Sequence, residues 1–198
     1  MEYRGFPADR KAEMIVNVNY WSPGRKQFTI VSESGSKFIL DHVFKRLLES
    51  EQEAANQENR RETELSEANY SFRMLAYEHS PSGPRYVLEA TPKSKNKFLF
   101  RGTIWVDGTD FAVTRMAGEP ARSPSMWIKR TDIEHRYVKV QDFWLPAENH
   151  TESVIRLGGR ADLTIEYKDY KVVAAAPVDG IEDLDASSAL AAVFDRLD

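Results

Sequence analysis

Apolar and polar residues alternate with a period of two through most of this sequence, which restricts the chain to a largely β fold. The clearest example is segment 12–20, where one face would carry Ala12, Met14, Val16, Val18 and Tyr20. Such alternation is typical of a strand with one buried face. Beyond residue 69, turn residues recur about every ten positions with no helical stretch between them. This spacing favours a meander of antiparallel strands over alternating strands and helices.

A single segment breaks the β pattern. Between 37 and 55, apolar residues recur three and four positions apart, as Leu40, Phe44 and Leu47 illustrate. This spacing predicts one amphipathic helix, with Ser36 as its N-cap. The expected fold is therefore mainly β (α+β): a strongly curved antiparallel sheet, or incomplete β-barrel, of about 9–10 strands with one covering amphipathic helix.

Turn-forming residues and composition divide the chain into one domain and a tail. Residues 1–176 show no composition break and predict a single domain. Residues 177–198 are acidic and are expected to be mobile or loosely docked, with a short helix at Ala189–Leu197. Within the domain, Gly102 predicts a bend or bulge in a strand, and the Gly158–Gly159 pair predicts a hairpin turn.

Net charge and composition argue against several functional classes. The formal charge is −4 and the pI is near 5.7, so the chain lacks the basic surface expected of a nucleic-acid-binding protein. There are no cysteines, so disulfides and thiol nucleophiles are excluded. No apolar run reaches the ~18 residues that a membrane-spanning helix needs.

Catalytic and metal-binding motifs are not apparent in the sequence. The histidines are far apart and none has the spacing of a His-Glu-x-x-His metal site; they are His42, His79, His135 and His150. No nucleophile elbow or phosphate loop is present. The prediction is a protein that is not an enzyme and binds no metal or cofactor.

Paired carboxylates could still hydrolyse glycosides without forming a recognisable motif. The candidates are Asp107, Asp110 and Asp132. Each has a polar or turn-forming neighbour, and an aspartate in a turn hydrogen-bonds its own backbone. These three residues are therefore interpreted as turn and surface residues, and an enzyme remains the minor alternative.

The proportion of strand to helix predicts a binding function. One helix of ~28 Å covers only part of a sheet this broad, which must either close tightly or leave an apolar hollow for a hydrophobic guest. Alternation predicts the residues that line this hollow: Tyr70, Phe72, Met74, Tyr86, Leu88, Phe98, Phe100 and Ile104. The predicted helix would add a lid made of Leu40, Phe44 and Leu47.

Several of these strands also resemble a known family. The stretches are Phe98-Leu-Phe-Arg-Gly-Thr-Ile-Trp-Val-Asp107, Phe111-Ala-Val-Thr-Arg-Met-Ala-Gly-Glu-Pro120, Phe143-Trp-Leu-Pro146 and Leu163-Thr-Ile-Glu-Tyr167. Together they resemble the outer-membrane lipoprotein-sorting superfamily, the LolA-like fold, over about residues 69–170. The resemblance implies a half-barrel, closed by a helix, that accommodates a lipid or a lipoprotein acyl chain.

The same resemblance implies a periplasmic location and a leader peptide upstream of Met1, which would itself begin inside an edge strand. Relatives with this half-barrel instead act as envelope-stress sensors. The alternative function is therefore an envelope sensor or interaction module that docks a membrane-protein partner. In that case an exposed rim containing Trp127 or Trp144 would matter more than the hollow.

Overall fold

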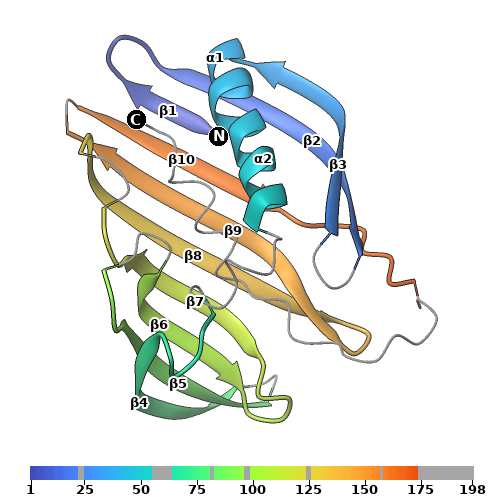
Figure 1. Ribbon diagram of the computed structural model, residues 1–198, viewed down its shortest axis with the longest axis vertical. Helices are drawn as coiled ribbons and strands as arrows, with labels where there is room; N and C mark the ends of the chain where they lie inside the picture. The colour runs from blue at the N-terminus through green and yellow to red at the C-terminus, as the bar shows by residue number, and fades with distance from the viewer. Residues whose placement is uncertain are drawn as a thin grey trace.

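The computed structural model describes residues 1–21, 25–54, 64–80, 83–95, 99–123, 126–156 and 158–173. Within these residues, ten antiparallel strands form one unclosed sheet, and one helical segment lies against one end of it (Figure 1). The predicted mainly β class and antiparallel pairing are confirmed. The tail 177–198, with its predicted short helix, and Phe98 lie outside the described residues.

The strands are β1 (Glu2–Gly5), β2 (Arg10–Trp21), β3 (Arg25–Gly35), β4 (Tyr70–Ser80), β5 (Gly83–Pro92), β6 (Phe100–Asp107), β7 (Val113–Pro120), β8 (Ile128–Val140), β9 (Phe143–Ile155) and β10 (Gly159–Glu166). Their order in the sheet is β3-β2-β1-β10-β9-β8-β7-β6-β5-β4. Strands β4 to β10 thus form the predicted meander, in which each strand pairs with the next along the chain.

The N-terminal strand lies inside the sheet. β1 pairs with β2 on one side and with β10 on the other, and the Met1 amine donates a hydrogen bond to the Ala12 carbonyl over 2.9 Å. The expectation that Met1 begins in an edge strand is therefore wrong. The edges of the sheet are β3 and β4. β1 is internal because the last described strand, β10, returns to pair with it.

The helical segment runs without a break through α1 (Lys37–Ile39), the π-helical turn η1 (Leu40–Phe44) and α2 (Lys45–Ala54). These bounds confirm the predicted helix from Lys37 to Ala54, and Ala55 lies outside the described residues. Ser36 occupies the N-cap, as predicted, but its side chain makes no capping hydrogen bond. Its carbonyl instead accepts a hydrogen bond from the Leu40 amide at 3.1 Å. In the described part of the chain, no helix is long and apolar enough to cross a membrane.

Buried apolar side chains form two separate clusters. The helix cluster joins the helix to the sheet and comprises Ala12, Ile39, Leu40, Phe44 and Leu163. The strand cluster lies on β4 to β7 and comprises Tyr70, Ala90, Leu99, Phe100, Ile104 and Met116. The described helical residues contribute nothing to the strand cluster, so the helix covers only one end of the sheet.

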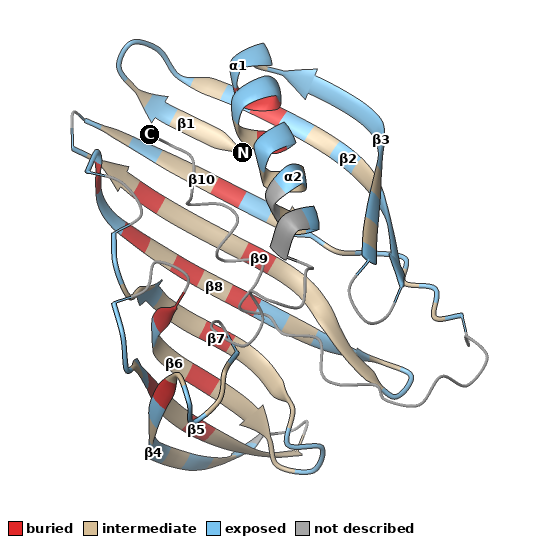
Figure 2. Ribbon diagram, viewed as in Figure 1, coloured by how far each residue is buried: buried red, intermediate tan, exposed pale blue. Residues whose placement is uncertain are grey.

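Strand register places both clusters on the same face of the sheet, which we call the inner face. One row of directly paired residues crosses seven strands: Phe72, Ala90, Gly102, Gly118, Ile133, Thr151 and Leu163. Figure 2 shows buried segments from β4–β7 through β8 and β9 to β10, whereas β3 is largely exposed. The opposite surface, which we call the outer face, carries most of the charged residues of the central strands.

Irregular pairing occurs at positions that alternation does not reveal. Gly102 pairs in register with Gly118, and the shift between β6 and β7 falls between Trp105 and Val106. The predicted bulge at Gly102 is therefore misplaced. The predicted hairpin turn before β10 is confirmed, since Gly158 has a φ of 86° between the paired strands β9 and β10.

Candidate functional site

The predicted ligand-lining residues that the structure describes lie at the β4–β7 end of the sheet. Tyr70, Phe100 and Ile104 are fully buried members of the strand cluster. Phe72 and Leu88 are partly buried against it. This part of the predicted set is therefore packed against other side chains of the same chain, and only the margin of the cluster is open to solvent.

A β-bulge at Leu75 changes which residues of β4 share a face. Met74 pairs with Leu88, whereas Ala76 pairs with Val87, one position along, and Tyr77 then pairs with Tyr86. Ala76 therefore leaves the face of Met74, where simple alternation places it. Tyr77 takes up an inner-face position instead.

The bulge completes an aromatic rim, which we define as Tyr77, Tyr86 and Phe111. The ring centroids of Tyr77 and Tyr86 are 5.0 Å apart, and those of Tyr86 and Phe111 are stacked at 6.1 Å. Tyr77 is 49% exposed and Phe111 is 69% exposed, and nearby Met74 is 59% exposed. An apolar surface therefore leads from solvent to the margin of the strand cluster.

Between the two apolar clusters, the inner face becomes polar. One row of paired residues runs Met74, Leu88, Ile104, Met116, His135, Asn149 and Ile165. His135 and Asn149 therefore stand between apolar neighbours on both sides, and they are only 4% and 7% exposed. Alternation alone predicts an apolar face here and does not reveal this pair.

Three polar residues of the inner face, His135, Asn149 and Tyr167, form what we call the polar band. All three are uncharged at neutral pH. Burial lowers the pKa of His135 to about 4 and raises the pKa of the Tyr167 hydroxyl above its usual range. Asn149 donates through Nδ2 to the Tyr167 hydroxyl at 3.2 Å. The Oδ1 of Asn149 is buried without a hydrogen-bond partner.

The predicted lid residues belong to the opposite end of the inner face. Leu40 and Phe44 are buried in the helix cluster, and Leu47 packs at its margin. They contact the β2 and β10 side of the sheet, through Ala12 and Leu163, rather than the strand cluster. The structure therefore separates the predicted lid from the predicted ligand-lining residues.

The three aspartates considered for glycoside hydrolysis have other partners. Asp107 Oδ1 accepts hydrogen bonds from the amides of Thr109 and Asp110, which is the turn role predicted for it. Asp110 accepts from Lys139 and from Trp144 Nε1, and these bonds, that of Lys139 foremost, lower its pKa. Asp132 pairs with Arg130 at 2.7 Å.

One group of potential metal ligands does form, on the outer face. His150, Glu152 and Asp162 bring one ligand atom each to within 4.8 Å of one another. Their spacing does not match the His-Glu-x-x-His pattern, because that pattern belongs to a helix and these residues lie on strands. His150 and Glu152 are two residues apart on a strand, and the turn at Gly158 places Asp162 opposite Glu152. The position of this turn in the sequence is the signal from which the proximity of the three residues could have been predicted.

No family model, curated protein or solved structure matches this chain. The LolA-like resemblance therefore stays a prediction.

Proposed function

We propose that this protein is a non-enzymatic binding protein that holds a lipid or a lipoprotein acyl chain on the inner face of its sheet, which would act as a half-barrel of the LolA-like kind. The observation that carries the proposal is the aromatic rim, together with exposed Met74. These side chains continue the apolar surface of the strand cluster into solvent at the end of the sheet that the helix leaves open.

The free energy for binding would come from apolar burial. At ~0.8 kcal/mol per buried CH₂, an acyl chain gains affinity without any charged contact. Methionine and aromatic side chains adapt well to such a guest, because a flexible thioether and flat rings fit many chain conformations. The rim residues are therefore suited to a ligand defined by its apolarity rather than by its shape.

The polar band supports a more specific ligand chemistry. His135 is uncharged at neutral pH, and Asn149 and Tyr167 carry no charge there either. A chain lying across β4–β7 would bring its polar end to this band, where Asn149 Oδ1, which is buried without a partner, can accept a hydrogen bond once the side chains that cover it move aside. We therefore propose an amphiphile whose polar end is a neutral donor, such as a hydroxyl or amide group.

Titration with a fluorescent fatty alcohol or fatty amide tests this proposal on the intact protein. The wild type should bind with saturation, and Phe111→Ala and Tyr77→Ala should each weaken binding. Phe6→Ala is the matched control, because Phe6 is an 83% exposed aromatic residue that follows β1, outside the rim. Absence of saturable binding, or equal loss in the Phe6 control, would overturn the proposal.

Solvent extraction of protein purified from its native host, followed by mass spectrometry, identifies any lipid that accompanies it. The proposed periplasmic location follows from the family resemblance and is tested separately by fractionating cells that express the native gene. If the protein is found in the cytoplasm and still binds the amphiphile, the envelope role is excluded but the binding function stands.

A second candidate is the envelope sensor or interaction module that docks a membrane protein. The β2–β3 hairpin favours it, because this hairpin exposes Ile15, Val18, Ile30 and Val31. Trp127 is also exposed, whereas Trp144 donates its Nε1 hydrogen bond to Asp110. Cross-linking in envelope extracts separates the candidates: a stable protein partner with no extracted lipid favours the second.

A further inference from the structure

The outer face contains a row of four carboxylates that face one another across four neighbouring strands. Glu2 on β1 pairs with Asp162 on β10, Asp162 pairs with Glu152 on β9, and Glu152 pairs with Asp132 on β8. Like charges directly opposite each other on a sheet destabilise it. A row of this kind therefore needs positive charge from another source.

Protein cations supply that charge at three of the four positions. Glu2 pairs with Arg4 and Lys11 at 3.0 and 2.9 Å. Asp132 pairs with Arg130 at 2.7 Å, and Glu152 has only a long contact of 3.7 Å with Arg160. Within the described residues, Asp162 has no ion pair, although it lies between two other carboxylates. The deficit of positive charge is thus centred on Asp162 and Glu152.

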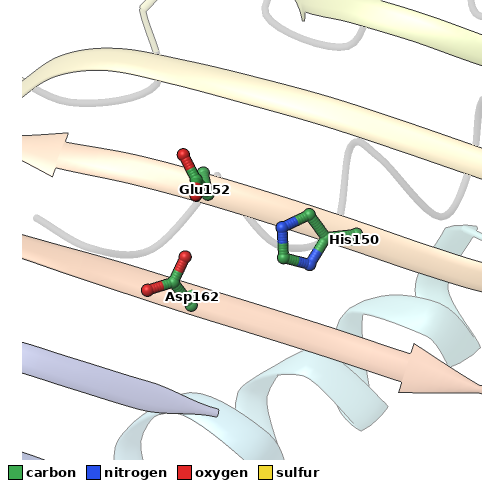
Figure 3. Close-up of side chains that lie close together, drawn as sticks. All are labelled: His150, Glu152 and Asp162. Carbon is green, nitrogen blue, oxygen red and sulfur yellow. The ribbon is translucent and has the colours of Figure 1, made fainter.

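A histidine stands beside this deficit. His150 is two residues before Glu152 on β9, and Figure 3 shows its ring close to the carboxylates of Glu152 and Asp162. Its Nδ1 lies 3.0 Å from the Thr164 hydroxyl oxygen. In the tautomer in which Nδ1 donates to that hydroxyl, Nε2 carries the free lone pair. This is the arrangement that orients metal-binding histidines, whose second ring nitrogen is held by a hydrogen bond.

We propose that His150, Glu152 and Asp162 bind one divalent transition-metal ion of the Zn²⁺ type. One imidazole nitrogen and two carboxylate oxygens form a donor set that Zn²⁺ accepts, with water completing a tetrahedron. Ligand atoms about 2.0–2.2 Å from Zn²⁺ lie roughly 3.4 Å apart in a tetrahedron. The three groups, within 4.8 Å of one another, need only small side-chain movements to reach this spacing.

The bound ion would neutralise the carboxylates of Glu152 and Asp162 and link β9 to β10 on the outer face. This inference is independent of the proposed amphiphile site, because the metal ligands point away from the inner face. Partial exposure of all three ligands leaves room for the water ligand.

Competition between the protein and a chelating dye for Zn²⁺ measures the site directly, after prior treatment with a strong chelator. The wild type should bind one equivalent. Asp162→Asn and His150→Gln should each weaken binding by about tenfold or more, because each removes a ligand that the others cannot replace. Asp132→Asn and His79→Gln are the matched controls, since one changes the same row and the other changes a histidine elsewhere; neither should alter the affinity.

Thermal unfolding in chelator and in Zn²⁺ gives a second readout. If the three residues had only a structural role, the melting temperature would not depend on Zn²⁺. In chelator, Asp162→Asn should melt at or above the wild-type temperature, because the substitution removes repulsion within the row. In Zn²⁺, only the wild type and the controls should gain stability. If Asp162→Asn is unfolded, the histidine ring signals of the wild type decide: Zn²⁺ should shift the signal that His150→Gln removes.

Three results would overturn the proposal. The first is the absence of a one-to-one complex, and the second is equal Zn²⁺ affinity in the wild type, Asp162→Asn and His150→Gln. The third is a loss of binding that follows His79→Gln, since that would place the ion on a surface histidine outside the carboxylate row.

Discussion

Gly102 on β6 and Gly118 on β7 lie directly opposite each other on the inner face. A Cβ at Gly102 would come within 2.1 Å of the Ala117 carbonyl oxygen, and a Cβ at Gly118 equally close to that of Arg101. Both neighbours are backbone atoms, so a rotamer change cannot relieve the contact. The two strands can adopt this geometry because neither position carries a side chain.

Gly118→Ala should therefore destabilise the protein by about 1–3 kcal/mol, as expected for overpacking that shifts the backbone. Urea unfolding at neutral pH measures the change. Gly158→Ala provides the contrast: a Cβ there would meet nothing within 4 Å, and the cost would arise only from its φ of 86°. A Gly118→Ala protein as stable as the wild type would show that β6 and β7 can move slightly apart without loss of stability.

The stability of the protein should fall in mild acid because of His135. Burial lowers the pKa of this side chain to about 4 from 6.5, so the unfolded state binds a proton more readily than the folded state between these values. Stability is retained above about pH 6.5, falls as the pH drops through this window, and has lost roughly 3 kcal/mol from this group below pH ~4.

Urea unfolding of the wild type and His135→Leu at pH 7.5 and pH 4.5 isolates this contribution from that of the carboxylates. The wild type should lose more stability than the variant between the two pH values. Equal losses would mean that His135 is protonated in the folded protein, in disagreement with its burial.

Asn149 and Tyr167 should show strong energetic coupling. Tyr167→Phe removes the acceptor of the Asn149 Nδ2 bond and should cost about 1 kcal/mol or more, since the amide group is then buried without any partner. Adding Asn149→Leu removes the unsatisfied amide, so the double variant should recover much of that loss.

The same double variant separates stability from binding. If the polar band receives the polar end of an amphiphile, Asn149→Leu with Tyr167→Phe should weaken binding of a fatty alcohol and leave binding of a plain alkane probe unchanged. Parallel titrations of the folded variant with the two probes check this. Equal effects on both probes would place the ligand's polar end elsewhere.

Asp107 should stabilise the turn between β6 and β7 through its carboxylate. Asp107→Ala removes the acceptor of two backbone amides, those of Thr109 and Asp110, and should cost about 1 kcal/mol. Asp107→Asn retains an acceptor oxygen and should lose less. Chemical unfolding of the two variants measures both losses, and equal losses would assign the stabilisation to the charge, which both variants lack, rather than to the hydrogen bonds.

Local pattern was enough to predict most of the fold. The alternation from Ala12 to Tyr20 and the spacing of Leu40, Phe44 and Leu47 predicted a strand and a helix that the structure confirms. The internal position of β1 was not predictable in this way, because it depends on pairing between the two ends of the described chain. The bulge at Leu75 was also missed, since an inserted residue leaves the local composition unchanged.

The site residues were harder to predict than the strands. Alternation correctly grouped Tyr70, Phe100 and Ile104 on one face, but it could not distinguish buried packing from an open surface. The spacing of the histidines says only that His135 is not part of a His-Glu-x-x-His site, and strand register is needed to show that it faces Asn149. Register likewise brings Asp162 opposite Glu152, a relation that becomes visible once the hairpin turn at Gly158 is fixed.

The internal position of β1 affects how the chain folds during synthesis. Strands β4 to β9 each meet a sequence neighbour and can pair as soon as they leave the ribosome, whereas β1 must wait for β10, which emerges much later. Among the described strands, β1 is thus one of the last to find both of its partners. Until then, β1 pairs only with β2 and leaves its other edge unpaired, which makes that edge a template for pairing with another chain.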